Sequence, residues 1–197
     1  MAEKILLYLI RHGETRANSP RNSTFRGWSD IPLDASGKAA AIKLAQQFSR
    51  ISLSSIISSD IPRAVETAQT ISPGAKTDAD LRPWNVGMFT GKERNKFMPL
   101  MQEFVQDPSR IVPRGESLDQ FQKRVLGAIS SYAQHSLPAP IAIVTHGSVI
   151  TAIKRQYDPK STAVFLKDNE VVPGGVLVIT SDGKLSPWSG APTAGGK

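Results

Sequence analysis

The fold is decided by the stretch Leu6-Leu7-Tyr8-Leu9-Ile10-Arg11-His12-Gly13-Glu14-Thr15, in which a continuous apolar run ends in an arginine, a histidine and a glycine. A short apolar run without polar alternation is typical of a strand that is covered on both faces of a sheet. In open α/β sheets, ligands bind just beyond the carboxyl ends of such strands. The stretch therefore predicts a buried strand that delivers Arg11 and His12 to a site at its carboxyl end.

The second half of the chain repeats this arrangement in Ile141-Ala142-Ile143-Val144-Thr145-His146-Gly147-Ser148. The chain has only three histidines, and two of them follow runs of this kind, each with a glycine that lets a ligand approach the backbone. A lone histidine after a strand is more often an ordinary turn residue than a catalyst. Two such endings and an adjoining arginine favour one shared site. We therefore predict that His12, His146 and Arg11 gather around an anion.

Further motifs follow in order along the chain. They are Arg11 to Thr15 with Asn18, Arg26-Gly27-Trp28-Ser29-Asp30-Ile31-Pro32-Leu33 with Gly37, Ser58 to Ala68, Gly115-Glu116-Ser117, and Val144-Thr145-His146-Gly147. Together they resemble the signature of the histidine phosphatase superfamily, on its phosphoglycerate mutase-like branch. The resemblance covers roughly residues 5–181 and implies a three-layer α/β fold. It also implies that Arg11, His12, Arg63 and His146 handle a phosphoryl group.

The size and composition of the chain suit a single domain with a buried core, since it has 197 residues of which 40% are hydrophobic. We expect this domain to span residues 1–189, followed by a flexible tail over residues 190–197. The sequence has no cysteine, which excludes a disulfide framework and a thiolate nucleophile. The apolar run Ile5–Ile10 is far shorter than the ~20 residues of a membrane span. We therefore expect a cytoplasmic protein that has no membrane partner.

The net charge of +7 attracts polyanions, which include both nucleic acids and phosphorylated metabolites. The basic residues are scattered, with no run of five or more and no interleaved aromatic pattern. This distribution disfavours specific nucleic-acid binding. The partner predicted by the charge is a small phosphorylated substrate or a phosphoprotein, and a homodimer is a further possibility that the sequence leaves open.

Alternating strand and helix patterns predict a three-layer α/β sandwich, with a mainly parallel central sheet and helices on both faces. The expected strands cover residues 5–10, 54–58, 78–81, 141–145 and 176–180, and a hairpin at Asp182-Gly183 leads to a short edge strand. The expected helices cover residues 38–48, 118–134 and 148–156, and one more begins near Ile61. Residues 16–36 predict a loop over the strand ends. Residues 82–117 predict a small helical cap inserted into the domain.

Arg63 falls in the first turn of the helix that Ser59-Asp60-Ile61-Pro62 begins. A cation is unfavourable there, because the amino end of a helix carries partial positive charge. An exposed, solvated arginine is the ordinary explanation of such a residue. A phosphate bound between the guanidinium group and free backbone N–H groups is the functional one, and the resemblance favours it.

The chemistry expected of these residues is phosphoryl transfer through a covalent intermediate. A neutral imidazole is a good nucleophile toward phosphorus, so His12 is the predicted nucleophile, with its other ring nitrogen fixed by a backbone carbonyl. Arg11 and Arg63 supply charge-assisted donors to the phosphoryl oxygens, and a protonated His146 adds a third. Neutral donors are expected from Asn18 and the Gly147 backbone, and substrate contacts from Arg26 and Gly27. Because these groups neutralise a phosphate, no metal or cofactor is expected.

One position departs from the resemblance. The family expects a glutamate as general acid at the third position of a Leu-x-Glu-x-x-x-Gly-x-x-x-Gly stretch, and the stretch Leu81–Gly91 has Pro83 there. Glu116 is the first candidate to replace this acid, although holding an arginine in place is an equally good role for it. Asp60 is a weaker candidate.

The function expected from the sequence is a metal-independent phosphomonoester hydrolase that acts through a phosphohistidine on His12. The alternative is a protein that binds a phosphorylated ligand or phosphoprotein with weak or no turnover, because Pro83 replaces the acid. A phosphoprotein phosphatase would use the same pocket under a more open cap. A phosphoglycerate-type mutase is less favoured, since mutases of the family are usually longer and carry the missing glutamate.

Overall fold

A six-stranded sheet with the order β3-β2-β4-β1-β5-β6 forms the centre of the computed structural model, which describes residues 4–18, 23–136, 138–157, 165 and 171–190. The strands are β1 (Ile5–Arg11), β2 (Ser55–Ser58), β3 (Lys76–Thr77), β4 (Ile141–Thr145), β5 (Val176–Thr180) and β6 (Leu185–Pro187). The strands β3, β2, β4 and β1 run parallel to one another, whereas β5 and β6 pair antiparallel. The sheet is therefore mixed, and its parallel part carries the two strands that end in histidine.

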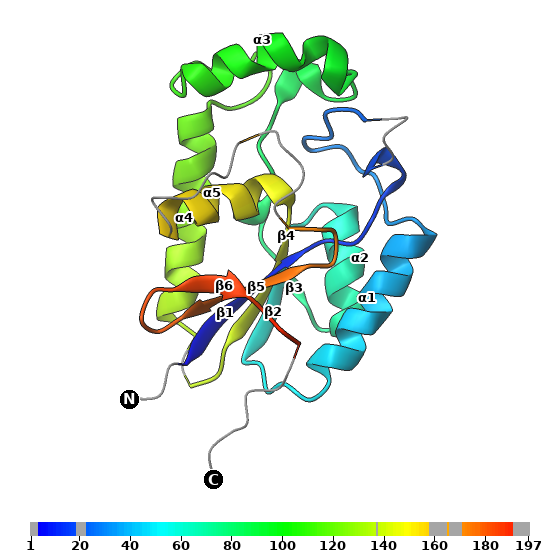
Figure 1. Ribbon diagram of the computed structural model, residues 1–197, viewed down its shortest axis with the longest axis vertical. Coiled ribbons are helices and arrows are strands. Elements are labelled where there is room, and N and C mark those ends of the chain that lie inside the picture. The colour runs from blue at the N-terminus through cyan, green and yellow to red at the C-terminus, as the bar shows by residue number, and fades with distance from the viewer. Residues whose placement is uncertain (1–3, 19–22, 137, 158–164, 166–170, 191–197) are drawn as a thin grey trace.

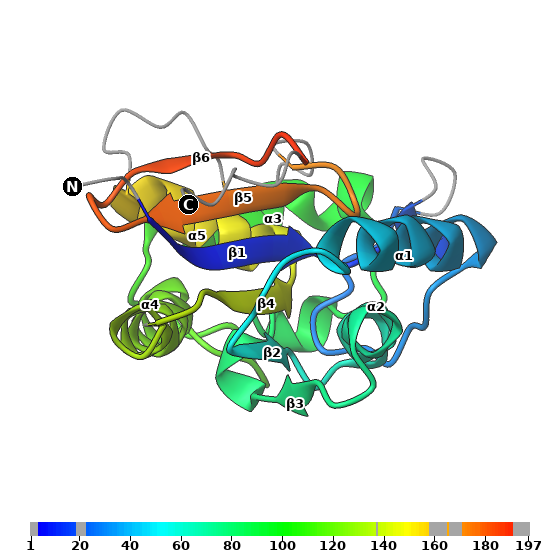
Figure 2. The same ribbon diagram turned by 90° about the horizontal axis from the view of Figure 1, so that it is seen from below.

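The alternate side chains of β1 enter two different cores, which explains why its sequence shows no polar alternation. Leu7 and Leu9 belong to the larger core, together with buried residues of α4 (Leu118–Gln134) and α5 (Gly147–Tyr157). Tyr8 and Ile10 belong to the smaller core, together with residues of α1 (Ala35–Phe48) and α2 (Pro62–Ile71). Figure 2 shows these two pairs of helices on opposite sides of the sheet. The expected three-layer arrangement is confirmed.

The cap lies at the top of the molecule in Figure 1, above α4 and α5. Its helical parts are the 3-10 helix η4 (Gly87–Phe89) and the helix α3 (Arg94–Gln106). The loop after β1 reaches this region, because the N–H of Phe25 donates to the carbonyl of Lys92 at 3.0 Å and that of Arg94 donates to the carbonyl of Ser23 at 3.0 Å. The loop and the cap thus meet over the carboxyl ends of the parallel strands.

The starts of two helices follow from side-chain hydrogen bonds, and that of a third does not. The side chain of Asp34 accepts from the N–H of Gly37, so α1 begins at Ala35, three residues before the start expected from the sequence. In α4, Ser117 and Gln120 form a capping box. The helix α2 begins at Pro62, as expected. Its N-cap residue is Ile61, whose side chain makes no capping hydrogen bond.

The strand expected over residues 78–81 is wrong. In this part of the chain only Lys76 and Thr77 pair with β2, and the residues Ala79–Leu81 form the 3-10 helix η3. The side chain of Asp78 accepts from the N–H of Asp80 at 2.8 Å, and this local bond competes with continuation of the strand ladder. The hairpin at residues 182–183 is confirmed, since β6 follows it.

Two further expectations concern the tail after residue 189 and the lack of a membrane span. The tail expected over residues 190–197 lies outside the described residues except for Gly190. Within the described ranges, no helix combines the length and the apolar character that a membrane span needs.

Candidate active site

A cavity of about 80 Å³ lies beside the carboxyl ends of β1 and β4. Its described lining consists of Arg11, His12, Arg26, Gly27, Arg63, Pro83, Trp84, Val86, Arg94, His146, Gly147, Ser148, Thr151 and Phe165. Four of these residues are arginines and two are histidines, and the set contains no carboxylate. A concave surface of this composition suits a multiply charged anion.

His12 continues the line of β1, because its backbone N–H donates to the carbonyl of Thr145 at 2.9 Å. Its Nδ1 lies 2.7 Å from the carbonyl oxygen of Gly13. A carbonyl oxygen can only accept, so Nδ1 carries the proton and Nε2 holds the free lone pair. The side chain is 3% exposed, and burial, followed by the charge of Arg63, holds its pKa well below 6.5. His12 therefore has the neutral form and the tautomer that a nucleophile at Nε2 requires.

Arg63 occupies the first turn of α2, as expected from the sequence, and its side chain is buried. Its Nε–H donates to His12 Nε2 at 3.3 Å. Its two terminal nitrogens donate to backbone carbonyls of the loop after β1, Nη1 to Ser29 at 2.9 Å and Nη2 to Gly27 at 3.1 Å. Burial, together with the neighbouring Arg26, lowers the pKa of Arg63 to about 9, so the group is still a cation at neutral pH. The loop thus fixes a cation beside the nucleophilic nitrogen.

Gly27 supports this arrangement through its backbone. Its φ of +44° lies in the left-handed region, which favours glycine. A Cβ atom at this position would lie 2.9 Å from the side chains of Thr90 and Val86. The loop can therefore pass close to the cap and still aim the carbonyl of Gly27 at Arg63.

His146 follows β4, and its ring centroid lies 5.1 Å from that of His12. The side chain is 3% exposed, and both ring nitrogens are buried without a hydrogen-bond partner in the part of the chain that the structure describes. Burial, followed by the charge of Arg63, holds the pKa of His146 well below 6.5, so the ring is neutral. Buried polar groups are nearly always paired in folded proteins. The ring of His146 therefore indicates a ligand with hydrogen-bonding oxygens.

Arg11 and Gly147 complete the base of the cavity. The Nη1 of Arg11 donates to the carbonyl of Val171 at 2.7 Å, which holds the guanidinium group against the chain before β5. Gly147 is the first residue of α5, and a Cβ atom there would lie 3.5 Å from the Cζ of Arg11. The amino end of α5 consequently opens into the cavity beside Arg11, where free backbone N–H groups favour an anion.

Asn18, which the sequence predicts as a phosphate or substrate ligand, lies outside the described lining. Its Oδ1 accepts from the hydroxyl of Thr15 at 2.6 Å and from the Nη1 of Arg26 at 2.8 Å. Arg26 itself lines the cavity. In this state Asn18 acts through Arg26, whose guanidinium group it holds at the wall.

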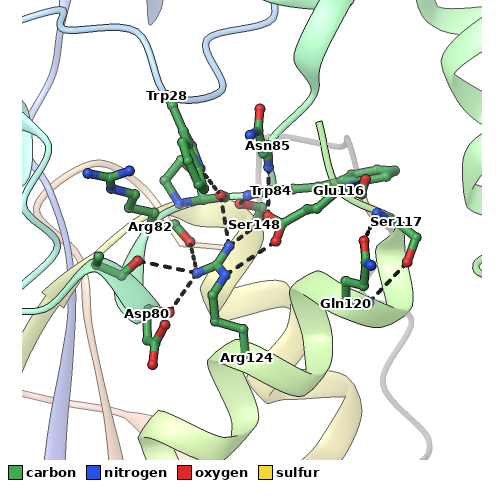
Figure 3. Close-up of polar contacts among 12 residues, drawn as sticks. Trp28, Asp80, Arg82, Trp84, Asn85, Glu116, Ser117, Gln120, Arg124 and Ser148 are labelled. Atoms are coloured by element: carbon green, nitrogen blue, oxygen red, sulfur yellow. Dashed lines mark hydrogen bonds and ion pairs between the residues drawn. The ribbon is translucent and has the colours of Figure 1, made fainter. Parts of the chain in front are cut away.

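Glu116 also lies outside the described lining, in the cluster that Figure 3 shows. Its Oε1 accepts from the Nη2 of Arg124 at 2.7 Å and from the backbone N–H of Asn85 at 2.9 Å. The same guanidinium group donates to the carbonyls of Asp80 at 2.7 Å and Arg82 at 3.1 Å (Figure 3). These contacts match the alternative role of holding an arginine, and the assignment of Glu116 as general acid stays a prediction.

Pro83 lines the cavity, and its carbonyl oxygen accepts from the indole N–H of Trp28 at 2.9 Å. The other candidate acid, Asp60, accepts two hydrogen bonds from Arg82, at 2.7 and 2.6 Å. These hydrogen bonds lower the pKa of Asp60, which keeps the carboxylate ionised at neutral pH. Asp60 therefore has no proton to donate under those conditions.

Sequence reasoning did not find several residues of the lining. Ser148 and Thr151 follow Gly147 on α5, so the position of that glycine at a helix start could have indicated them. Trp84 and Arg94 enter from the cap, where no repeating pattern ties residues to the strand ends. In the described residues, no group of three or more histidines, cysteines or carboxylates is placed to hold a metal ion.

The chain was compared with known proteins. Residues 7–184 match the sequence profile of the histidine phosphatase superfamily (branch 1). The chain is 31% identical to phosphoglycerate mutase-like protein 4 of Arabidopsis thaliana over an alignment of 170 residues. This alignment covers 80% of this chain and 73% of that protein. It is 32% identical to a phosphoglycerate mutase from Thermus thermophilus of known crystal structure, with a TM-score of 0.70 over 90% of this chain and 92% of that one. A phosphoglycerate mutase from Bacillus anthracis str. Sterne gives a TM-score of 0.76 over 95% of this chain and 93% of that one, but its 23% identity supports the fold alone.

Proposed function

We propose that this chain, which belongs to branch 1 of the histidine phosphatase superfamily, is a phosphomonoester hydrolase in which His12 forms a phosphohistidine intermediate. One observation carries the proposal. His12 is a buried neutral imidazole whose Nδ1–H is held by the carbonyl of Gly13, and its Nε2 lies 3.3 Å from the Nε of Arg63. This is the arrangement of a nitrogen nucleophile next to a cation that can bind the group under attack.

In the first step, the Nε2 of His12 attacks phosphorus and the bond from phosphorus to the ester oxygen breaks. The Nε–H of Arg63, which donates to Nε2 in the free protein, transfers its hydrogen bond to a phosphoryl oxygen. Arg11 and the amino end of α5 bind further oxygens. Water then attacks the phosphohistidine and releases inorganic phosphate. No metal is required, because the guanidinium groups already offset the phosphoryl charge.

His146 is proposed to change its protonation state when the phosphate enters. Without a bound anion its ring is expected to be neutral, because burial and the nearby Arg63 lower its pKa. A dianionic phosphate beside the ring favours the charged imidazolium form. The protonated ring then donates to a phosphoryl oxygen and supplies the partner that its nitrogens lack in the free protein.

A phosphoglycerate-type mutase is the second candidate, and it is supported by the names of the relatives from Arabidopsis thaliana and Thermus thermophilus. A mutase passes the phosphoryl group between two alcohol oxygens, so each of its two steps needs a proton transfer at an alcohol. The described cavity lining contains no carboxyl group that could perform either transfer. In hydrolysis the second nucleophile is water, whose proton can pass to the released phosphate and to solvent, so a carboxyl group is missed mainly in the first step, which is the reason to prefer hydrolysis.

The test is hydrolysis of p-nitrophenyl phosphate by the wild type, by His12→Ala and by His135→Ala, each with a chelator present. His135 is an exposed histidine at the end of α4 and serves as the matched control. We expect activity in the wild type and in His135→Ala, loss of activity in His12→Ala, and an alkali-stable phosphoenzyme that forms only when His12 is present. Wild-type activity no higher than that of His12→Ala would instead favour a phosphate-binding protein. Transfer of the phosphoryl group to added glycerate in place of water would favour the mutase.

A further inference from the structure

The described lining of the cavity lacks any carboxylic acid that could protonate a leaving group. Its charged members are Arg11, Arg26, Arg63 and Arg94, which stay protonated at neutral pH. The two carboxyl groups that could replace an acid at Pro83 are both engaged elsewhere, Asp60 by Arg82 and Glu116 by Arg124. An ester oxygen that leaves this site must therefore depart without a proton from a described carboxyl group.

Three of the remaining polar groups of the lining are also committed to other contacts. The hydroxyl of Thr151 donates to the carbonyl of Gly147 at 3.1 Å, and the hydroxyl of Ser148 accepts from the backbone N–H of Trp84 at 3.4 Å. The Nδ1 proton of His12 is held by the carbonyl of Gly13. None of these three groups has the acidity of a carboxylic acid, so they offer little to an alkoxide. His146 is the one lining side chain whose ring nitrogens have no partner among the described residues, and the proton proposed for it is donated to a phosphoryl oxygen.

The cavity is well suited to an anion that departs unprotonated. Arg94 enters the lining from the first turn of α3 on the cap side, and its guanidinium carbon lies 5.3 Å from the centre of the Phe25 ring. Arg26 is held at the same wall by Asn18. Together with Arg11 and Arg63 they surround the cavity with positive charge. Fixed cations stabilise charge that develops on a leaving oxygen in the transition state.

Building on the phosphatase function proposed above, we propose that the substrates are phosphoryl compounds whose leaving group is itself a stable anion, namely aryl, enol or acyl phosphates and phosphoanhydrides. In the first step the bond from Nε2 of His12 to phosphorus forms, and the bond from phosphorus to the leaving oxygen breaks. The electron pair of that bond stays on the leaving oxygen, which departs as an anion beside Arg26 and Arg94. Water then attacks phosphorus, and the bond from phosphorus to Nε2 breaks with its electron pair returning to His12. The protons of the water pass to the released phosphate and to solvent. Phosphates of simple alcohols are poor substrates because their leaving oxygen needs a proton.

The experiment measures kcat/KM for p-nitrophenyl phosphate, phenyl phosphate, acetyl phosphate and glycerol phosphate. Proton donation by a side chain is typically worth about 10²–10⁴-fold. We expect glycerol phosphate to react slower than p-nitrophenyl phosphate by at least such a factor, and acetyl phosphate to react as well as the aryl esters. Glycerol phosphate reacting within about tenfold of p-nitrophenyl phosphate would overturn the proposal, because an acid must then assist the leaving group.

A pair of variants adds an independent test. Pro83→Glu places a carboxyl group on the wall, and Pro83→Gln is its match in size without the acid. We expect Pro83→Glu to react with glycerol phosphate about 10²-fold faster than Pro83→Gln does, and the two to differ little on p-nitrophenyl phosphate. Equal rates of the pair on glycerol phosphate would contradict the proposal. If either variant fails to fold, the wild-type series decides alone.

Failure of this proposal is distinguishable from failure of the phosphatase function. If the chain only binds phosphate compounds, no phosphohistidine forms on His12 with any of the four compounds, and if it is a mutase, the phosphohistidine forms and passes its phosphoryl group to glycerate in place of water. If only the substrate class is wrong, the phosphohistidine forms from p-nitrophenyl phosphate and from glycerol phosphate at similar rates.

Discussion

His12 and His146 are both buried as neutral rings among arginines, and this has a consequence for stability. Their pKa values lie well below 6.5, with burial as the first cause and the charge of Arg63 as the second. Above pH 6.5 both rings are neutral in the folded and in the unfolded chain. Below that pH the unfolded chain binds protons that the folded chain does not, so stability falls as the pH falls.

The free energy of unfolding is therefore expected to decrease between pH 7 and pH 5. Each buried histidine contributes up to about 1.4 kcal/mol per pH unit below its unfolded pKa. His146→Gln should therefore have a shallower decrease than the wild type, because one of the two buried rings is removed. Urea unfolding at several pH values measures this. An unchanged slope in His146→Gln would show that this ring titrates normally in the folded protein.

At the scale of secondary-structure elements, the wall of the cavity depends on a residue of α4. Arg124 donates to four backbone carbonyls of residues 79–83, namely those of Ala79, Asp80, Arg82 and Pro83. Glu116 fixes the same guanidinium group from the other side, as Figure 3 shows. The ion pair is mostly buried, with side chains that are 17% and 16% exposed. The 3-10 helix η3 and the residues that follow it are thereby attached to α4.

Glu116→Gln separates the two roles that the sequence left open for this residue. The amide keeps an oxygen for Arg124 and for the N–H of Asn85, but it has no acidic proton. If Glu116 only positions Arg124, kcat/KM for aryl and alkyl phosphates should change by similar, small factors. If Glu116 is the general acid, the rate on alkyl phosphates should fall by about 10²–10⁴-fold while aryl phosphates are less affected. We expect the first result.

The loop after β1 is also attached to α1 by a close backbone contact. A Cβ atom at Gly13 would lie 2.6 Å from the carbonyl oxygen of Gly37, in the first turn of α1. Real Cβ atoms do not approach backbone that closely, so a side chain at Gly13 would push α1 away from the nucleophile. This packing, in addition to the turn itself, explains the glycine that follows His12.

Gly13→Ala is therefore expected to destabilise the protein by about 1–3 kcal/mol through overpacking, and to reduce activity. The control is Gly127→Ala in the middle of α4, where the new methyl group meets no atom within 4 Å. That change should stabilise the helix by up to about 1 kcal/mol. Thermal or urea unfolding of the two variants measures both effects. Equal stability of the two variants would contradict the close contact.

At the scale of the whole molecule, the net charge of +7 and the four arginines of the cavity act in the same direction. A dianionic substrate is attracted over a range set by the ionic strength, about 10 Å at 0.1 M salt. We expect kcat/KM for p-nitrophenyl phosphate to fall severalfold between about 0.01 M and 0.3 M potassium chloride, mainly through KM. A salt-independent kcat/KM would show that attraction over the surface contributes nothing to binding.

The sequence by itself determined the parallel part of the sheet, the family and the central residues of the site. β1 and β4 are apolar on both faces, and His-Gly follows each of them. Because the two strands pair in parallel, with Arg11 opposite Thr145, His12 and His146 lie side by side. Arg63 was found because a cation in the first turn of a helix conflicts with local preference, and such conflicts are common at functional sites.

Only the tertiary structure decided what depends on contacts between distant parts of the chain. It showed that Glu116 pairs with Arg124, that Arg94 and Trp84 reach the cavity from the cap, and that the described lining has no carboxyl group. It also showed that the 3-10 helix η3, capped by the side chain of Asp78, takes the place of the strand expected over residues 78–81. Period and propensity describe neighbours along the chain, whereas these features depend on which side chains meet in space, and that is set by the packing of α4 and the cap against the sheet.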